Sequence, residues 1–241
     1  MAALTETQIL SAVYTNIELD ATDWSATSDE YLAGRRFCNQ SINRWENAIV
    51  IQQGKEVPIK WRELWANLTD ASDGTKTQTA GTYSYSCPTN FKSPGSYVRT
   101  VTTGGDSTIW DVVGIDRVAS LVKESGYKFC YFSGNQKDGF KINFNPLITL
   151  TTGDTIKYEY YKYATTFTTT TSTTEIADPY FIVCDVTGHF LKDEDAAQSK
   201  FWFNQADARL NQMIGNNMIG LEGVAETIHS SLDDDNVGFG Y

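Results

Sequence analysis

The sequence is poor in the side chains that carry acid–base and nucleophilic chemistry. It holds only two histidines in 241 residues, and four cysteines that never form a Cys-x-x-Cys pair. It also lacks the Gly-x-Ser-x-Gly elbow of hydrolases, the P-loop that holds nucleotide phosphates and the Gly-x-Gly-x-x-Gly loop of dinucleotide-binding folds. These absences predict a protein that is not an enzyme, with no catalytic residue and no cofactor.

The few reactive side chains have simple structural interpretations. His189 follows Gly188 in a helical pattern, which favours a hydrogen-bonded helix residue over a catalytic base, and His229 is expected to be exposed. The scattered cysteines predict buried thiols in a reducing cytoplasm rather than a disulfide framework or a zinc site. They are Cys38, Cys87, Cys130 and Cys184.

Membranes, metals and nucleic acids are not favoured as ligands. No apolar run approaches the roughly 20 residues of a membrane-spanning helix, and the first ten residues lack the pattern of a signal peptide. The net charge of −11 argues against sequence-independent binding of DNA, because phosphates are bound by Lys and Arg. The run from Asp233 to Asn236 resembles the start of a calcium loop, but the Glu at its twelfth position is missing, so we expect no metal site.

Residues 1–72 are predicted to be helical. A first helix starts near Thr5, and a second starts at Ser28, whose side chain suits an N-cap. Apolar residues recur at helical spacing from Tyr31, and Gly54 is expected to end this helix. Its opposite face is polar, with Arg35, Arg36, Asn39, Asn43 and Glu46. A third helix is predicted after Pro58, from the spacing of Trp61, Leu64, Trp65 and Leu68.

Residues 73–174 are predicted to form a β-domain. They are rich in Tyr, Val, Ile, Thr and Phe, with Gly and Pro as punctuation. The predicted strands are 82–87, 97–102, 112–122, 128–132, 140–144 and 155–164. Residues 135–139 predict a hairpin turn with Gly139 at positive φ, and the threonine-rich run 165–174 predicts a loop with no core.

Residues 175–215 are predicted to be helical again. Asp178-Pro179 indicates the start of one helix, and the acidic run from Asp193 indicates the start of the next, with Gly215 as its end. Residues 216–241 are expected to be a flexible, extended arm. The fold class predicted from these patterns is α+β: a helix bundle built from the N- and C-terminal helices, with an inserted antiparallel β-sandwich or barrel-like domain.

One strand is crowded with tyrosines, at positions 158, 160, 161 and 163. Such a strand suits either a sugar-stacking platform or ordinary packing on the two faces of a sheet. We favour packing, because aromatic side chains are common in strands.

An ordered series of segments resembles a known family. Residues 138–146 read Asp-Gly-Phe-Lys-Ile-Asn-Phe-Asn-Pro, and residues 153–162 read Gly-Asp-Thr-Ile-Lys-Tyr-Glu-Tyr-Tyr-Lys. A polar loop, Asp178-Pro179 and two helices follow. This series resembles the head–tail connector adaptors of tailed phages, including the tail tubular protein A type. The helix with residues 35–43 is similar to the opening helix of that family, although residues 81–113 make a longer β-insert than in its compact members.

The resemblance implies a structural virion protein of the neck and tail, assembled in the host cytoplasm. It implies a homo-oligomeric ring, typically dodecameric, that binds the portal protein on one side and a tail or nozzle protein on the other. DNA would pass through the ring without sequence-specific binding. In related adaptors the C-terminal segment grips the portal, so we expect the spaced apolar residues of the arm to be the portal interface. These are Met218, Ile219, Leu221, Ile228, Leu232, Phe239 and Tyr241.

Three other functions stay open at this point. A virion-associated carbohydrate- or receptor-binding β-module is the main alternative, although helices at both ends of the chain do not favour it. A small hydrolase with dispersed acidic residues is the second alternative, and the sequence proposes no site for it. The third is a structural protein of some other assembly.

Overall fold

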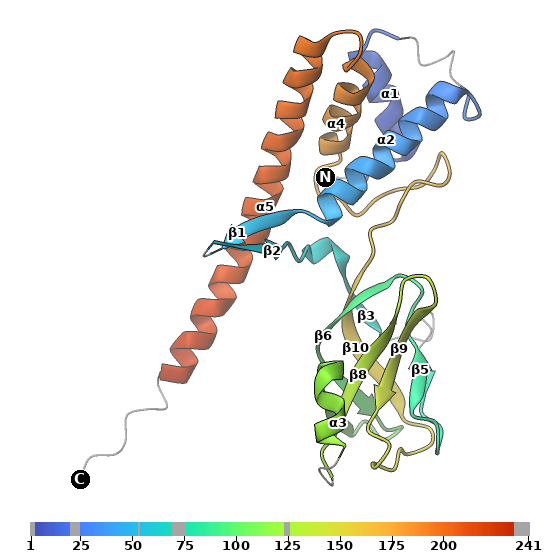
Figure 1. The fold of residues 1–241 in the computed structure, drawn as a ribbon, viewed down its shortest axis with the longest axis vertical. Coiled ribbons are helices and arrows are strands. Elements are labelled where there is room, and N and C mark those ends of the chain that lie inside the picture. The colour runs from blue at the N-terminus through green and yellow to red at the C-terminus, as the bar shows by residue number, and fades with distance from the viewer. Residues whose placement is uncertain (1–2, 20–24, 53, 69–75, 123–125, 234–241) are drawn as a thin grey trace. The chain divides into compact units, whose positions relative to one another are not determined.

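The chain divides into two compact units. The computed structural model describes residues 3–19, 25–52, 54–68, 76–122 and 126–233, with side chains up to residue 218 (Figure 1). The helical unit comprises Met1–Glu63 and Ala164–Tyr241, and the sheet unit comprises Leu64–Tyr163. The fold class is therefore α+β, as predicted. The expected boundary at residue 72 lies outside the described residues, and residue 174 falls inside the helical unit.

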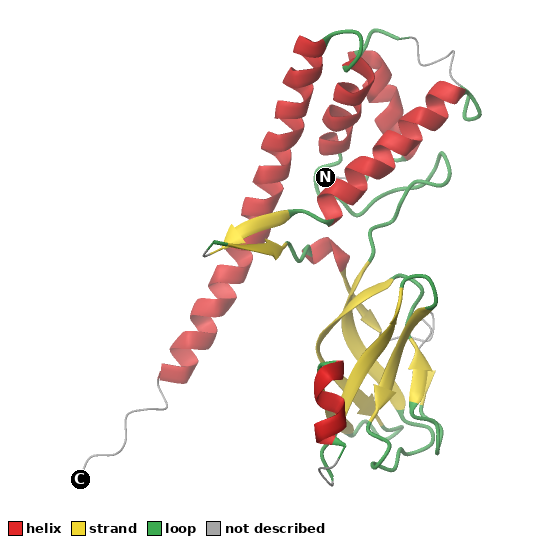
Figure 2. Cartoon of the chain, in the orientation of Figure 1, coloured by secondary structure: helices red, strands yellow, loops and turns green. Residues whose placement is uncertain are grey.

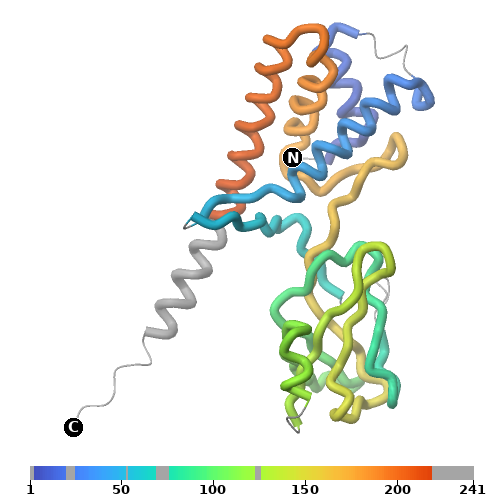
Figure 3. Tube along the Cα trace, viewed as in Figure 1, coloured from blue at the N-terminus to red at the C-terminus, as the bar shows by residue number. Residues whose placement is uncertain are grey.

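Both ends of the chain contribute helices to the helical unit. They are α1 (Glu6–Asn16), α2 (Asp29–Glu46), α4 (Tyr180–Leu191) and α5 (Ala196–Asp233). Figure 2 shows these helices in red, and Figure 3 shows the blue and orange chain segments that form them. Helix α4 packs against the other three. Its residues from Phe181 to Gly188 are all buried, as expected for a helix with neighbours on every side.

The predicted helix starts are confirmed by their caps. Thr5 and Gln8 form a reciprocal capping box at the start of α1. The side chain of Ser28 accepts a hydrogen bond from the backbone N–H of Tyr31 at the start of α2. At α5, Asp195 Oδ1 accepts from the backbone N–H groups of Ala197 and Gln198 in the first turn. Short polar side chains at the right position were sufficient to locate all three starts.

The predicted end of α2 is wrong. The helix ends at Glu46, and a hairpin follows with strands β1 (Ile49–Gln52) and β2 (Lys55–Pro58). Three consecutive β-branched residues at 49–51 favour a strand over a helix. Gly54 has φ +76° and belongs to the hairpin turn, where a residue without Cβ is favoured.

The predicted third helix is also wrong. In its place are a short 3-10 helix η2 (Arg62–Leu64) and strand β3 (Trp65–Leu68). Trp61 stacks on Trp45 in the helical unit, with ring centroids 5.0 Å apart, whereas Leu68 is buried in the core of the sheet unit. The helical spacing of these apolar residues therefore arises because they serve two different cores.

The sheet unit contains one curled, mixed sheet. Its strands are β3, β4 (Lys76–Thr77), β5 (Ser84–Ser86), β6 (Phe91–Val101), β7 (Ser107–Val112), β8 (Phe129–Asn135), β9 (Gly139–Phe144) and β10 (Thr155–Lys162). Within the described residues their order is β3-β10-β6-β7-β8-β9-β5, and β4 also pairs with β10. The predicted turn at 135–139 joins β8 to β9, and Gly139 has φ +85°.

The domain was predicted to be an antiparallel sandwich or barrel-like, and the antiparallel part of this prediction is corrected at β7 and β8, which pair in parallel. A parallel pair needs a crossover, because a tight turn can join only antiparallel strands. The 3-10 helix η4 (Ile115–Arg117) and helix α3 (Val118–Leu121) lie in this crossover, so the strand predicted over 112–122 is wrong beyond Val112. A single curled sheet takes the place of the two packed sheets of a sandwich, so the barrel-like alternative is the nearer of the two.

Aromatic rings fill the inside of the curl. Phe91 on β6 stacks on Phe132 of β8 and Tyr160 of β10, with ring centroids 5.1 Å and 5.6 Å apart. Trp110 meets Phe144 edge to face at 4.9 Å. Strands on both sides of the parallel β7–β8 pair therefore share one hydrophobic core.

Helix α5 is longer than predicted. It runs through Gly215 to Asp233, so residues 216–233 are helical rather than extended. A glycine inside a helix costs only about 1 kcal/mol relative to alanine, so Gly215 alone is not enough to end this helix. No helix in the described parts of the chain combines the length and the apolar character needed to cross a membrane.

Candidate functional site

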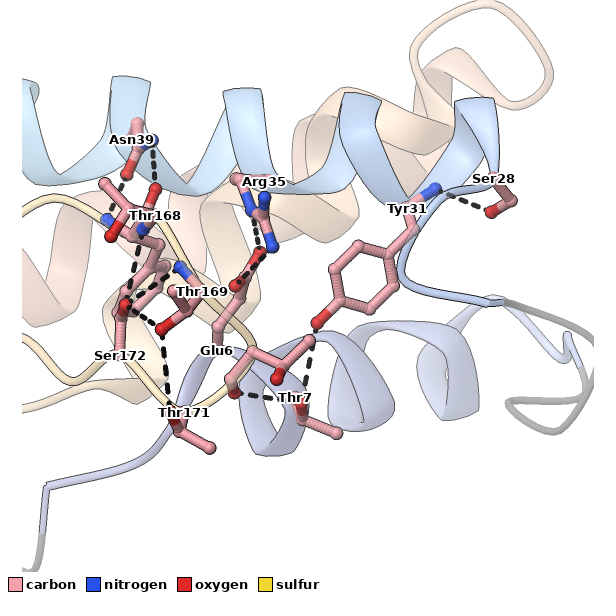
Figure 4. A network of polar contacts seen from close by, with 12 residues as sticks. Glu6, Thr7, Ser28, Tyr31, Arg35, Asn39, Thr168, Thr169, Thr171 and Ser172 are labelled. Atoms are coloured by element: carbon pink, nitrogen blue, oxygen red, sulfur yellow. Dashed lines mark hydrogen bonds and ion pairs between the residues drawn. The ribbon is translucent and has the colours of Figure 1, made fainter.

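A polar network joins α1, α2 and a loop of residues 164–179, which we call the threonine loop (Figure 4). The carbonyl of Ser172 accepts from the N–H of Glu6 at 3.0 Å, and the carbonyl of Thr170 accepts from the N–H of Thr7 at 3.2 Å. These N–H groups belong to the first turn of α1, where the helix itself supplies no acceptor. The threonine loop therefore completes the start of α1.

The threonine loop is shaped by its own hydroxyl groups. Ser172 Oγ accepts from the backbone N–H groups of Thr168 and Thr169, at 3.3 Å and 3.0 Å. The hydroxyls of Thr169 and Ser172 lie 2.9 Å apart. Such side-chain-to-backbone bonds stabilise a turn without any regular secondary structure. The predicted loop is confirmed, and its internal hydrogen bonds give it a defined conformation.

Asn39 of α2 fixes the threonine loop at its start. Its Nδ2 donates to the carbonyl of Phe167 at 3.1 Å, and its Oδ1 accepts from the N–H of the same residue at 2.7 Å. The ring of Phe167 is only 1% exposed. The loop therefore does supply a core side chain, contrary to the prediction, because a single phenylalanine among threonines is enough to anchor it.

An ion pair is buried at the centre of this network. Glu6 is fully buried, and Arg35 binds both of its carboxylate oxygens, at 2.6 Å through Nε and 3.1 Å through Nη2. The hydrogen bond to Glu6 raises the pKa of Arg35, although burial acts in the opposite direction. The guanidinium carbon also lies 5.7 Å from the centre of the Tyr31 ring. This pair fixes the register of α1 against α2.

The outer side of α2 carries a shallow hollow of about 430 Å³. The lining residues all come from this helix, and they are Leu32, Arg35, Arg36, Asn39, Gln40 and Asn43. Guanidinium and amide groups can bind carboxylates or a peptide backbone. The predicted polar face of α2 therefore has two parts. Arg35 and Asn39 form hydrogen bonds inside the unit, and the rest of the face is accessible from the hollow.

A second polar cluster lies between α2, α4 and α5. Asp185 is 2% exposed, and its two oxygens lie 2.7 Å from Ser41 Oγ and 2.5 Å from Arg44 Nη1. Arg44 also binds Asp207 of α5. Burial lowers the pKa of Arg44, but Asp185 and Asp207 outweigh it and raise the pKa overall. The cluster ties three helices together through one arginine.

His189 borders this cluster without forming a nucleophile–base pair. Its Nε2 lies 4.0 Å from Asp185, while Ser41 is directed at Asp185 rather than at the imidazole. The ring stacks on Phe37 at 4.9 Å and meets Phe203 edge to face at 5.1 Å. Burial lowers the pKa of His189, with Asp185 opposing this and nearby cations adding to it. These contacts give the side chain a packing role.

The cysteines are free thiols with raised pKa values. Cys38, Cys130 and Cys184 are buried, as predicted, whereas Cys87 is half-buried. Burial is the main cause for each, and it raises the pKa of Cys87 to about 11. A thiol with such a pKa is a poor nucleophile at neutral pH. The described residues also contain no group of three His, Cys, Asp or Glu side chains that could hold a metal ion.

The expected portal residues fall on α5 or beyond it. Met218 is half-buried, and positions 219, 221, 228 and 232 lie on the helical backbone of α5. Residues 239 and 241 lie outside the described residues. The structure therefore changes the conformation expected for the arm, and does not test which partner it binds.

Asn217, just before these residues, was not found by sequence reasoning. Its Nδ2 donates to the carbonyl of Lys60 at 3.0 Å, and its Oδ1 accepts from the N–H of Arg62 at 3.3 Å. The Arg62 side chain donates back to the carbonyl of Asn217 at 3.2 Å. Asn217 therefore fixes α5 to the segment that precedes the sheet unit. Because the helix was predicted to end at Gly215, Asn217 fell in the expected extended arm, and no local pattern marked it.

The tyrosine-rich strand is used mainly for packing. Tyr158 and Tyr160 are each 4% exposed and belong to the core of the sheet unit. Tyr161 points to the other side and meets Trp65 edge to face at 4.7 Å. Two of the four tyrosines are thus unavailable for a sugar-stacking platform.

No known family model matches this chain. A search of curated proteins likewise finds no match.

Proposed function

We propose that the protein is a structural adaptor that joins the head of a tailed phage to its tail. The observation that carries the proposal is the order of elements in the second half of the chain. Strand β9 leads to Asn145-Pro146, β10 carries the Tyr-Glu-Tyr-Tyr run, and the threonine loop leads to helices α4 and α5. This is the order of segments that resembles the adaptor family.

The helical unit suits the wall of a ring around DNA. In this proposal α1, α2, α4 and α5 act as a helix bundle, and two ion clusters, one around Glu6 and one around Asp185, link its helices. The unit holds 21 acidic and nine basic residues. A strongly negative surface repels phosphate, so DNA would slide past it without being held.

The last part of α5 is the proposed portal contact. On a helical backbone, positions 218, 221, 228 and 232 recur at spacings that place them along one face. Apolar residues with this spacing suit the binding of a helix in a hydrophobic groove. The same residues are therefore proposed as the portal contact, now on a helix instead of an extended arm. Phe239 and Tyr241 follow this helix in the sequence.

A binding experiment with a truncated chain tests this proposal. The truncated chain should end at Met218, because this keeps the hydrogen bonds of Asn217. The full chain is expected to co-sediment with portal assemblies of the same virus, and the truncated chain to bind at least tenfold more weakly. Failure of the full chain to bind would refute the adaptor proposal.

Charge substitutions provide a matched control. The variant Ile228→Asp/Leu232→Asp places two acids on the apolar positions, and Thr227→Asp/Ser231→Asp places the same two charges beside them. The first variant should lose portal binding and the second should keep it. Equal binding by both would show that this face of α5 does not contact the portal.

A further inference from the structure

Charge is distributed unevenly between the two units. The sheet unit has ten basic and nine acidic residues, whereas the helical unit has an excess of twelve acidic residues. The overall charge of −11 therefore belongs to the helical unit alone. The two units of one chain differ enough in charge for surfaces of different copies to attract each other.

Two cations face each other on the outer surface of the curled sheet. Lys157 of β10 pairs directly with Arg99 of β6. Their neighbours along the strands, Ile156, Tyr158 and Val98, are buried in the core, so Lys157 and Arg99 lie on the opposite, outward face. Like charges in directly opposite positions destabilise a sheet.

The two cations lack a salt-bridge partner among the described residues of the unit. Within the described residues, neither Lys157 nor Arg99 forms an ion pair. A small hollow of about 20 Å³ adjoins both side chains, with Asn67, Tyr97 and Glu159 also in its lining. Its volume is roughly that of one water-sized group. An incoming carboxylate oxygen would fit it and offset the repulsion.

Two exposed apolar side chains lie beside the cations. Ile109 of β7 pairs with Arg99 and is 61% exposed, and Tyr97 on β6 is 41% exposed. Exposed apolar groups next to unpaired charges are typical of protein interfaces. The acids Asp111 and Glu159 lie on the same face, which suits a protein partner better than the continuous negative charge of DNA.

We propose that this outward face of β7, β6 and β10 binds the acidic helical unit of a second copy of the chain. The contact is heterologous, because a sheet surface of one copy meets a helical surface of the next, and such contacts generate rings when they close. The inference rests on the proposed function, since it names the subunit contact of the ring, but self-association can be measured without the portal.

Charge reversal on this face tests the inference. Self-association of the full chain, measured by sedimentation velocity, should weaken with added salt. The variant Arg99→Glu/Lys157→Glu should raise the dissociation constant at least tenfold. The control Lys128→Glu/Lys141→Glu reverses two exposed charges elsewhere in the same unit and should change it by less than twofold.

A second variant and a second assay keep the result interpretable. Lys157→Gln removes the facing charge, so it should fold with an unchanged or higher melting temperature and still associate more weakly than the wild type. Carbodiimide cross-linking of isotopically distinct copies should join Lys157 to carboxylates of residues 1–63 or 164–241.

Three outcomes would each overturn the inference. They are unchanged self-association of the reversed variant, a wild type that is monomeric with and without portal, and binding of DNA by this face instead. Portal binding by the reversed variant as single copies would overturn only the inference and leave the adaptor function in place.

Discussion

The Glu6–Arg35 pair shows how a buried charge can specify a helix arrangement. Glu6 is fully buried and Arg35 is 23% exposed, so their attraction is only weakly screened by solvent. A buried pair contributes little net stability, because both groups lose their hydration. Its effect is directional: an α1 displaced along α2 would leave a carboxylate without its partner.

Removing Arg35 should be much more harmful than removing both charges. We expect Arg35→Ala to lower the free energy of unfolding by about 3–5 kcal/mol, since it leaves Glu6 buried and unpaired. The double variant Glu6→Gln/Arg35→Gln should recover a large part of this loss. Urea unfolding followed by helical circular dichroism measures both, and simple additivity of the single substitutions would refute the coupling.

His189 should make stability depend on pH. Its folded-state pKa lies below the unfolded value of about 6.5, because burial and the cations Lys192 and Arg44 outweigh the attraction of Asp185. The unfolded chain then binds the proton more readily, so the free energy of unfolding should fall as pH drops below about 6.5. His189→Gln should flatten this dependence between pH 7.5 and 5.5; an unchanged slope in that variant would contradict the assignment.

Single residues were the hardest features to predict. The caps at Thr5 and Ser28 follow from local chemistry, so the sequence located them. Asn39 and Asn217 each bind backbone groups more than 120 residues away in the chain, and no local pattern encodes such a partner. The polar face of α2 was visible in the sequence, but its division between internal bonds and an open hollow depends on the threonine loop.

At the scale of elements, two glycines in helices have opposite roles. A Cβ on Gly188 of α4 would lie 3.0 Å from the ring of Phe203 on α5, which also meets His189 edge to face. A Cβ on Gly215 would meet nothing within 4 Å. The first glycine allows α4 and α5 to approach closely, whereas the second serves no packing purpose in the described chain.

Alanine substitutions should separate these roles. Gly215→Ala should raise the free energy of unfolding by up to about 1 kcal/mol, through helix propensity alone. Gly188→Ala has the same gain but also overpacks the α4–α5 contact, so we expect a net loss of about 1–2 kcal/mol. Thermal unfolding of the two variants side by side provides the measurement, and stabilisation by both would show that α4 and α5 are not closely packed at this point.

Helices and strands were predicted best where a single buried face determines the spacing of their apolar residues. Helices α1 and α2 and the strands around the Asn135–Gly139 turn each have one buried face, and their periodicity revealed them. The segment from Trp61 to Leu68 misled the prediction because its apolar residues are divided between two units. The parallel β7–β8 pair was missed because strand direction depends on the crossover, which the composition of residues 112–122 concealed.

At the scale of the whole molecule, the two units have different roles in the proposed adaptor. In the proposal, the acidic helical unit forms a wall around DNA and α5 binds the portal. The outward face of β7, β6 and β10 in the nearly neutral sheet unit would bind the next copy. The sequence predicted the α+β class and the central β-domain, because these follow from composition and periodicity. Subunit contacts depend on where distant strands place their outward side chains, and Lys157 and Arg99 became neighbours only in the folded sheet.

Electron microscopy of the protein mixed with portal assemblies from the same virus tests the adaptor function most directly. We predict an additional ring on one end of the portal, present only when the protein is added and built from repeated copies of the chain. Bare portals beside unassembled protein, over a range of salt concentrations, would contradict the proposed function.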